Sequence, residues 1–208
     1  MNWAAPPRYN RFAASVIAVV VALTTIAPPS FGNADPLAKR FGGPFKLISA
    51  TGGPVTDTSL RGRFLLVYFG YTSCPDICPT GLSVMTEAIE SLGVSGNAIQ
   101  PIFITVDPAR DTPQKLAEYA KSFHPRFLML TGSEDEIAAV AKAYRVHRHK
   151  FLFPGSDKSD QHYGVDHGSI TYLMGPDGQF RTLMPHGTPA ERMTEILKRH
   201  LTEGAALE

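Results

Sequence analysis

Short apolar runs alternate with amphipathic segments along most of the chain. Residues 64–70 and 100–106 are apolar almost throughout, which is typical of strands that are covered on both faces of a sheet. Helical spacing follows each run, over residues 80–92 and from Thr112-Pro113 to about residue 123, where proline takes the favoured first helical position. This part of the chain therefore predicts two consecutive strand–helix units.

The same alternation continues to the C-terminus. Residues 127–130 predict a third strand, and Ser133 with Glu136 predicts a capping box for a helix over residues 134–144. Residues 145–166 lack periodicity and predict a long loop. The remaining predicted elements are an N-terminal hairpin (45–50 and 55–58), a C-terminal hairpin (170–174 and 180–184) and a final helix (188–201). Together these elements predict an α/β fold with a mixed central sheet and helices on both faces.

Residues 1–34 have the pattern of a targeting segment. Arg8 and Arg11 precede an uncharged apolar run over residues 12–26, and small residues follow at 32–34. Because a membrane-spanning helix needs roughly 20 apolar residues, the segment is predicted as a signal peptide or a retained N-terminal membrane anchor. Both interpretations place the single predicted domain, residues 35–208, in the periplasm or an equivalent extracytoplasmic compartment. The domain would be soluble after cleavage, or associated with the membrane through residues 12–34.

The composition excludes several classes of protein. The 208 residues are 43% hydrophobic and carry a formal net charge of +1, which is typical of a globular domain. A dedicated nucleic-acid-binding protein would carry a large basic excess, so nucleic acid is not an expected partner. Two cysteines are too few for a disulfide scaffold or for the usual four-ligand structural zinc site.

The two cysteines form a C-x-x-x-C motif directly after the strand predicted at residues 64–70. Cys74 and Cys78 are expected in a loop at the carboxyl end of that strand, where open α/β sheets bind their ligands. The helix that follows would lower the thiol pKa values and favour thiolates. The spacing is one residue wider than in redox dithiols, and it is compatible with two thiolates that bind one soft metal ion. A third ligand must then come from elsewhere in the chain.

His167 is the strongest candidate for that ligand among the seven histidines. It comes just before an apolar strand, in the segment that passes beside the cysteine loop in a thioredoxin-like sheet. Thioredoxin-type enzymes have a proline there, and no proline occurs between Gly155 and Pro176. Metal ligation by Cys74, Cys78 and His167 is therefore favoured over a plain disulfide exchanger. The histidines at 147, 149 and 162 are interpreted as part of a solvated stretch rather than as a second metal site.

Three blocks of the chain resemble the signatures of the SCO/SenC copper proteins, which assist the assembly of cytochrome c oxidase. They are residues 64–80 (FLLVYFGYTSCPDICPT), 105–113 (TVDPARDTP) and 166–178 (DHGSITYLMGPDG), and the resemblance covers about residues 42–201. It implies a thioredoxin-like fold and copper ligation by Cys74, Cys78 and His167. It also implies, as partner, the copper-bearing subunit of the oxidase or another copper chaperone.

Two acidic residues of the second block are further candidates. Asp111 precedes Thr112-Pro113 and is interpreted most simply as a helix-start residue, with support of the metal ligands or contact with a partner as the alternative. Asp107 ends a predicted strand and either supports the cysteine loop or contacts a partner.

The expected function is copper delivery, with Cu(I) favoured by two thiolates and one imidazole, and the pattern does not decide whether Cu(II) binds as well. Oxidation of Cys74 and Cys78 to a disulfide would block this binding. Two alternatives use the same sulfurs. One is a thiol-disulfide oxidoreductase that reduces the cysteines of the oxidase copper site, and the other is a thiol-based antioxidant protein.

Overall fold

The computed structural model describes residues 1–3, 40–155 and 163–205. The chain divides into two units, Met1–Asn33 and Ala34–Glu208. Within the described residues, none of the helices is both long enough and apolar enough to cross a membrane. The apolar run at residues 12–26 lies outside the described residues, so its role as a signal peptide or an anchor stays a prediction.

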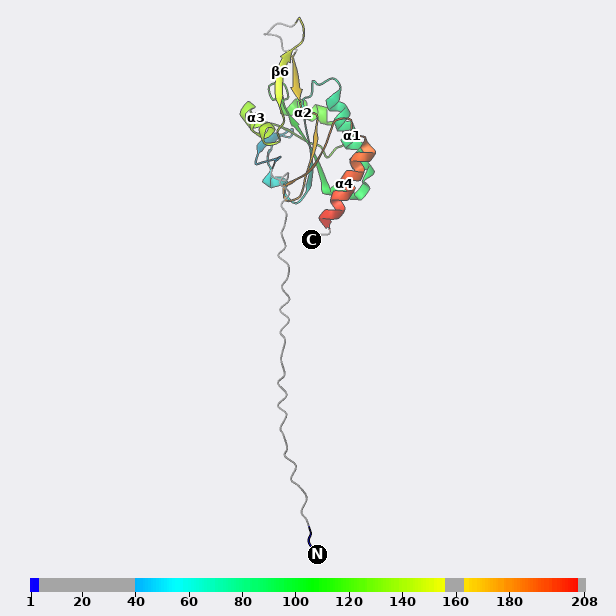
Figure 1. The fold of residues 1–208 in the computed structure, drawn as a ribbon. Coiled ribbons are helices and arrows are strands. Elements are labelled where there is room, and N and C mark those ends of the chain that lie inside the picture. Colours follow the sequence, from blue (N-terminus) through cyan, green and yellow to red (C-terminus); the bar gives the residue numbers. More distant parts are fainter. Residues whose placement is uncertain (4–39, 156–162, 206–208) are drawn as a thin grey trace. The chain divides into compact units, whose positions relative to one another are not determined.

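A seven-stranded mixed sheet forms the centre of the domain (Figure 1). Its strand order is β2-β1-β5-β4-β3-β8-β9. The strands are β1 (Lys46–Ser49), β2 (Pro54–Thr56), β3 (Phe64–Gly70), β4 (Ile99–Thr105), β5 (Leu128–Thr131), β8 (Thr171–Met174) and β9 (Phe180–Met184). The three central strands β3, β4 and β5 are parallel, and the outer strands pair antiparallel with them or with each other. The N-terminal hairpin β1–β2 and the C-terminal hairpin β8–β9 are therefore both confirmed.

Helices cover both faces of this sheet. They are α1 (Ile77–Ser91), α2 (Pro113–Ala120), α3 (Glu134–Ala143) and α4 (Ala190–Ala205), with short 3₁₀ turns at Thr58–Leu60 and Gly93–Ala98. Tyr68 and Phe103 contact α1 and α2 on one face, where α4 packs against α1 (Figure 1). Phe69 faces the other side and packs against Tyr144 at the end of α3. This arrangement is the thioredoxin-like fold, with the predicted extra hairpin at its N-terminal edge.

Strand β3 determines where the cysteine segment lies. All seven of its residues are buried, as expected for a continuous apolar run in the middle of a parallel sheet. Its last residue, Gly70, packs so closely that an added Cβ would lie 2.8 Å from the sulfur of Cys78. The carboxyl end of β3 is therefore held in the core immediately before the cysteine segment begins.

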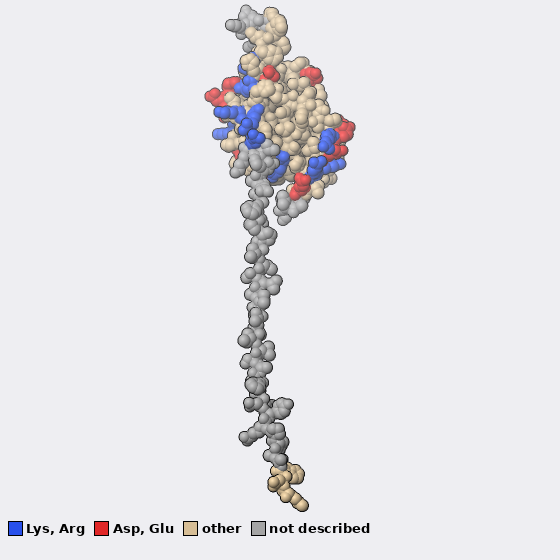
Figure 2. Space-filling view, in the orientation of Figure 1, with Lys and Arg blue, Asp and Glu red and all other residues tan. Residues whose placement is uncertain are grey.

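The prediction of a long loop over residues 145–166 is wrong for much of this segment. Strands β6 (Arg148–Leu152) and β7 (Tyr163–His167) pair antiparallel in a separate two-stranded sheet, and residues 156–162 are outside the described part of the chain. Much of β6 is solvent-exposed, so it shows no alternation of buried and exposed positions that would predict a strand. Near the end of β6 this hairpin exposes the apolar side chains of Phe151, Leu152 and Phe153. Figure 2 shows that the surface of the domain carries side chains of both charges.

Several helix boundaries also differ from the prediction, and α4 runs from Ala190 to Ala205 rather than over residues 188–201. Helix α1 begins at Ile77 rather than at residue 80, so Pro79 is its third residue and Cys78 lies in its first turn. Proline is tolerated there because the first backbone N–H groups of a helix have no intrahelical partner. Helix α2 ends at Ala120, three residues earlier than expected, and the following residues continue as a tight turn. The predicted capping box of Ser133 and Glu136 is confirmed.

Candidate metal centre

The two cysteines occupy different elements at the carboxyl end of β3. Cys74 lies in the loop between β3 and α1, where its backbone N–H donates to the carbonyl of Tyr71 at 3.1 Å. Cys78 lies in the first turn of α1 and is fully buried beneath Gly70. The expectation that both thiols precede the helix is therefore wrong for Cys78. Both sulfurs nevertheless lie at the strand end where the motif predicted them.

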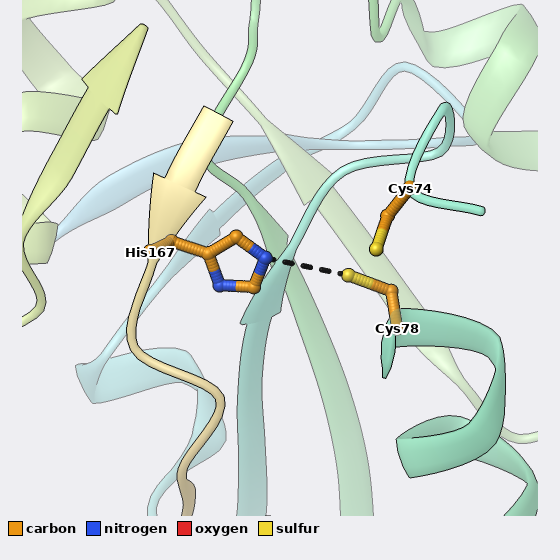
Figure 3. Close-up of side chains that lie close together, drawn as sticks. All are labelled: Cys74, Cys78 and His167. Atoms are coloured by element: carbon orange, nitrogen blue, oxygen red, sulfur yellow. Dashed lines mark hydrogen bonds between the residues drawn. The ribbon is translucent and has the colours of Figure 1, made fainter. Parts of the chain in front are cut away.

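His167 is the last residue of β7, and it reaches the two cysteines from the opposite side (Figure 3). Its Nε2 lies 3.4 Å from the sulfur of Cys78. One donor atom from each of the three residues lies within 4.8 Å of the others, and all three side chains are buried. The structure thus brings together the three residues that were predicted as metal ligands.

The imidazole of His167 is oriented by a neighbouring carbonyl that the sequence could not identify. Its Nδ1 lies 3.1 Å from the oxygen of Gly168. Because a carbonyl oxygen only accepts, Nδ1 carries the proton and the lone pair of Nε2 faces the sulfurs. The ring of Tyr71 packs edge-on against this imidazole, with 5.7 Å between the ring centroids.

The two thiols have very different acidities in the metal-free protein. A hydrogen bond from Cys78 is the largest of the effects that lower the pKa of Cys74 to about 4, against the opposing effect of burial. The same hydrogen bond, together with burial, raises the pKa of Cys78. The sequence predicted that the helix terminus would favour thiolates. The structure instead places one negative charge on Cys74 and keeps the proton on Cys78, in the helix.

A surface hollow of about 260 Å³ leads to the site. Cys74 and His167 line it, and Tyr71, Ile77 and Phe151 form apolar parts of its wall. The sulfur of Cys78 lies deeper, since its side chain is fully buried. An incoming ligand or thiol therefore meets Cys74 first.

Asp111 directly precedes the N-cap of helix α2, but its carboxylate contacts the cysteine loop rather than the helix. Its buried carboxylate accepts hydrogen bonds from the backbone N–H of Thr72 at 3.0 Å and from the hydroxyls of Thr72 and Thr105, both at 2.6 Å. Thr112 caps helix α2 instead, by accepting from the N–H of Lys115. Asp111 thereby joins the loop of Cys74 to the end of β4.

Asp107 faces the β6–β7 hairpin rather than the cysteines. Its buried carboxylate accepts a hydrogen bond from the hydroxyl of Tyr163 at 2.8 Å and forms an ion pair with Arg110. Sequence reasoning did not select Arg110 or Tyr163. Arg110 could have been selected because it lies inside the second block of resemblance, three residues after Asp107. Tyr163 lies outside all three blocks, so nothing in the sequence favoured its selection.

The other histidines near the hairpin are dispersed. His147 and His149 are exposed, and Nε2 of His147 lies 3.5 Å from the carboxylate of Asp166. His162 lies outside the described residues. In the part of the chain that the structure describes, the Cys74, Cys78 and His167 cluster is the metal-compatible group.

The donor set fits a soft transition-metal ion of low coordination number. With metal–ligand bonds of about 2.0 to 2.3 Å, three donors around one ion lie roughly 3.5 to 4 Å apart. The observed separations, up to 4.8 Å, need only a small closure of the three side chains. Thiolates and a neutral imidazole are the ligands that such ions prefer.

Comparison with known sequences places the chain among related proteins. A sequence model of the SCO1/SenC family matches residues 33–202. The SCO2-like protein of Rickettsia prowazekii is 41% identical over 182 residues, which cover 86% of this chain and 87% of that protein. Protein sco1 of Schizosaccharomyces pombe is 42% identical over 160 residues, covering 76% of this chain and 60% of that longer protein.

Solved structures give the same result. ScoI of Bradyrhizobium japonicum with copper bound is 40% identical, with a TM-score of 0.69 over 76% of this chain and 98% of that chain. ScoI of Arabidopsis thaliana with copper bound is also 40% identical, with a TM-score of 0.71 over 78% of this chain and 99% of that chain. BsSco, described as a cytochrome c oxidase assembly protein with a disulfide switch, is 28% identical, with a TM-score of 0.61 over 79% of this chain and 95% of that chain. The chain therefore belongs to the SCO1/SenC family.

Proposed function

We propose that this protein is a copper chaperone that assists the assembly of the copper centre of a cytochrome c oxidase, and that Cys74, Cys78 and His167 are its copper ligands. The observation that carries the proposal is the convergence of these three buried side chains from two distant segments. Relatives solved with copper bound, at 40% identity, support the identity of the metal. The description of BsSco as an oxidase assembly protein supports the choice of recipient.

The geometry favours Cu(I) as the ion that is carried. Two sulfur ligands and one imidazole match its softness and its low coordination number. Cys74 is already a thiolate, and Cys78 would release its proton when the ion binds, as thiol ligation requires. Access through the hollow at Cys74 would let a recipient ligand reach the ion without unfolding of the core.

An anaerobic Cu(I) titration of the reduced protein against a chromogenic chelator tests this proposal. One equivalent is expected to bind, His167→Ala is expected to weaken binding strongly, and Cys74→Ser is expected to abolish it. His200→Ala is a matched control, because His200 is distant from the cysteines. It lies in α4, one helical turn before Gly204, which packs near Phe64 at the end of β3 opposite the cysteine segment. Copper binding by the His167→Ala variant that equals that of the wild type would contradict the ligand assignment.

Thiol–disulfide exchange on the same partner is the second candidate function. It is favoured by the low pKa of Cys74, which lines the surface hollow and would act as the attacking thiolate on a disulfide of the partner. This chemistry needs both sulfurs but not His167. A His167→Ala variant that loses copper and retains thiol exchange would support the chaperone, whereas a wild-type protein that exchanges thiols and binds no copper would support the oxidoreductase.

The copper-bearing oxidase subunit is the proposed recipient, and another copper chaperone is the proposed source or alternative partner. An extracytoplasmic location is proposed on the basis of residues 1–34. Determining the N-terminal residue of the mature protein would distinguish a cleaved signal peptide from a retained anchor.

A further inference from the structure

Asp107 and Arg110 belong to neither ligand segment, yet Arg110 contacts both segments and Asp107 pairs with Arg110. Asp107 follows β4, and its carboxylate is fully buried. One oxygen accepts from the hydroxyl of Tyr163, and the other pairs with Nε of Arg110. The ammonium of Lys150 lies 4.0 Å from the first oxygen. Loss of any of these partners would leave the buried charge less compensated, so the carboxylate holds them in place.

The guanidinium of Arg110 connects the start of β7 to the start of the cysteine loop. It lies 3.7 Å above the ring centroid of Tyr163, and its Nη1 donates to the backbone carbonyl of the same residue at 2.9 Å. The ring of Tyr71 is 5.6 Å away, and this ring packs against the imidazole of His167. One partly buried cation therefore contacts the segment that carries His167 and the segment that carries Cys74.

We propose that Arg110 is a positioning residue that sets the distance between His167 and the two cysteines. This inference rests on the proposed function, in which His167 binds copper. Tyr163 and His167 are the first and last residues of β7, so a displacement of one end is transmitted to the other through the paired strands. Among the described residues, the β6–β7 sheet is separate from the seven-stranded sheet. Side-chain contacts rather than sheet hydrogen bonds therefore fix the position of β7.

The adjacent strand β6 has an attachment of its own. Nε of Arg148 donates to the carbonyl of Val106 at 3.1 Å, and its Nη1 pairs with Glu134 at 2.5 Å. These contacts hold the base of the hairpin when Arg110 is replaced. Arg110→Met is therefore expected to leave the hairpin folded but to let β7 and His167 move away from the sulfurs.

A double-mutant cycle for Cu(I) affinity tests the inference. Arg110→Met keeps a long apolar stem and removes the guanidinium. Groups that orient metal ligands typically contribute about 10- to 100-fold in affinity, so a loss in that range is expected in the wild-type background. In the His167→Ala background, Arg110→Met is expected to change the affinity less than about twofold. X-ray absorption of the copper-loaded single variant should also show weaker nitrogen scattering.

Arg126→Met is the matched control, because the guanidinium of Arg126 also donates to a backbone carbonyl, that of Gly96, at 2.6 Å. Its copper affinity should equal that of the wild type. Unchanged affinity in Arg110→Met would overturn the inference, and so would an equal loss in both backgrounds, which indicates a general structural effect. If His167→Ala alone leaves the affinity unchanged, the ligand assignment fails instead.

Tyr163→Phe keeps the inference testable if circular dichroism shows that Arg110→Met does not fold. This variant retains the ring beneath Arg110 and removes only the hydroxyl that donates to Asp107. A smaller loss of affinity is expected, again dependent on His167. An affinity equal to that of the wild type in Tyr163→Phe would overturn the inference.

Discussion

Replacing Gly70 by alanine is a direct test of how tightly the metal centre is built into the core. The added Cβ would lie 2.8 Å from the sulfur of Cys78, 2.8 Å from Cε2 of Phe103 and 3.2 Å from the ring of Tyr68. Gly70 ends a regular strand, so alanine can adopt its backbone conformation. The effect of the substitution is therefore steric.

The magnitude follows from two opposing contributions. A glycine-to-alanine change without strain stabilises a protein by about 0.4–1 kcal/mol, because it restricts the unfolded chain. Overpacking of a well-packed core costs about 1–3 kcal/mol. Cys78 and Phe103 are fully buried, so neither can withdraw into solvent and the steric cost prevails. Gly70→Ala is expected to lower the free energy of unfolding by about 1–2 kcal/mol, which corresponds to a Tm decrease of about 2–8 °C for a domain of this size.

Thermal unfolding of the reduced, metal-free protein measures this change, and Cu(I) competition measures the displacement of the Cys78 sulfur as weaker binding. Gly53→Ala is the control, because the nearest atom to its Cβ is Oγ of Ser49 at 3.8 Å, an ordinary contact. A Tm for Gly70→Ala at or above that of the wild type would refute the steric reasoning. A decrease of the same size in Gly53→Ala would show that the effect is not specific to the metal centre.

Asp111→Asn leaves one acceptor oxygen where three donors converge. The free energy of unfolding measured in urea should therefore fall by about 2–3 kcal/mol. An unchanged value would contradict the role of Asp111 in the cysteine loop. Ser133→Ala removes the cap of α3 and should cost about 1 kcal/mol in the same assay, whereas Ser133→Thr should retain most of the stability. Burial lowers the pKa of His200 from its ordinary value of 6.5, in spite of nearby Glu203, so protons bind the unfolded chain more readily. Stability should therefore decrease as the pH falls below about 6.5, and urea midpoints at pH 7.5 and pH 5.5 should show a smaller decrease in His200→Gln.

The parts of the fold that sequence could predict are those in which the local pattern and the tertiary environment agree. The strands β3 and β4 are apolar almost throughout because both of their faces are covered. The capping box of α3 depends on two residues three positions apart. Strand β6 had no such signal, because its sequence RHKFL faces solvent and its partner strand supplies the pairing.

The candidate site was predictable in its ligands but not in their support. Cysteine and histidine are rare residues with specific metal chemistry. The positions of Cys74, Cys78 and His167 next to two predicted strands were therefore enough to predict that they form one metal site. The carboxylates of Asp107 and Asp111 act on residues 56 and 39 positions away in the chain, respectively. Periodicity carries no information on such contacts, and each aspartate also has an ordinary local explanation as a turn or cap residue.

The 89-residue separation of Cys78 and His167 links metal retention to the completion of folding. A chain that has formed only its early strand–helix units offers two thiols and no imidazole, and closing so large a loop comes late because of its entropic cost. Copper held by the three proposed ligands would stabilise only the finished domain, by mass action on the native state. An incompletely folded or locally unfolded molecule, which lacks the imidazole ligand, would therefore retain the ion less tightly than a mature one.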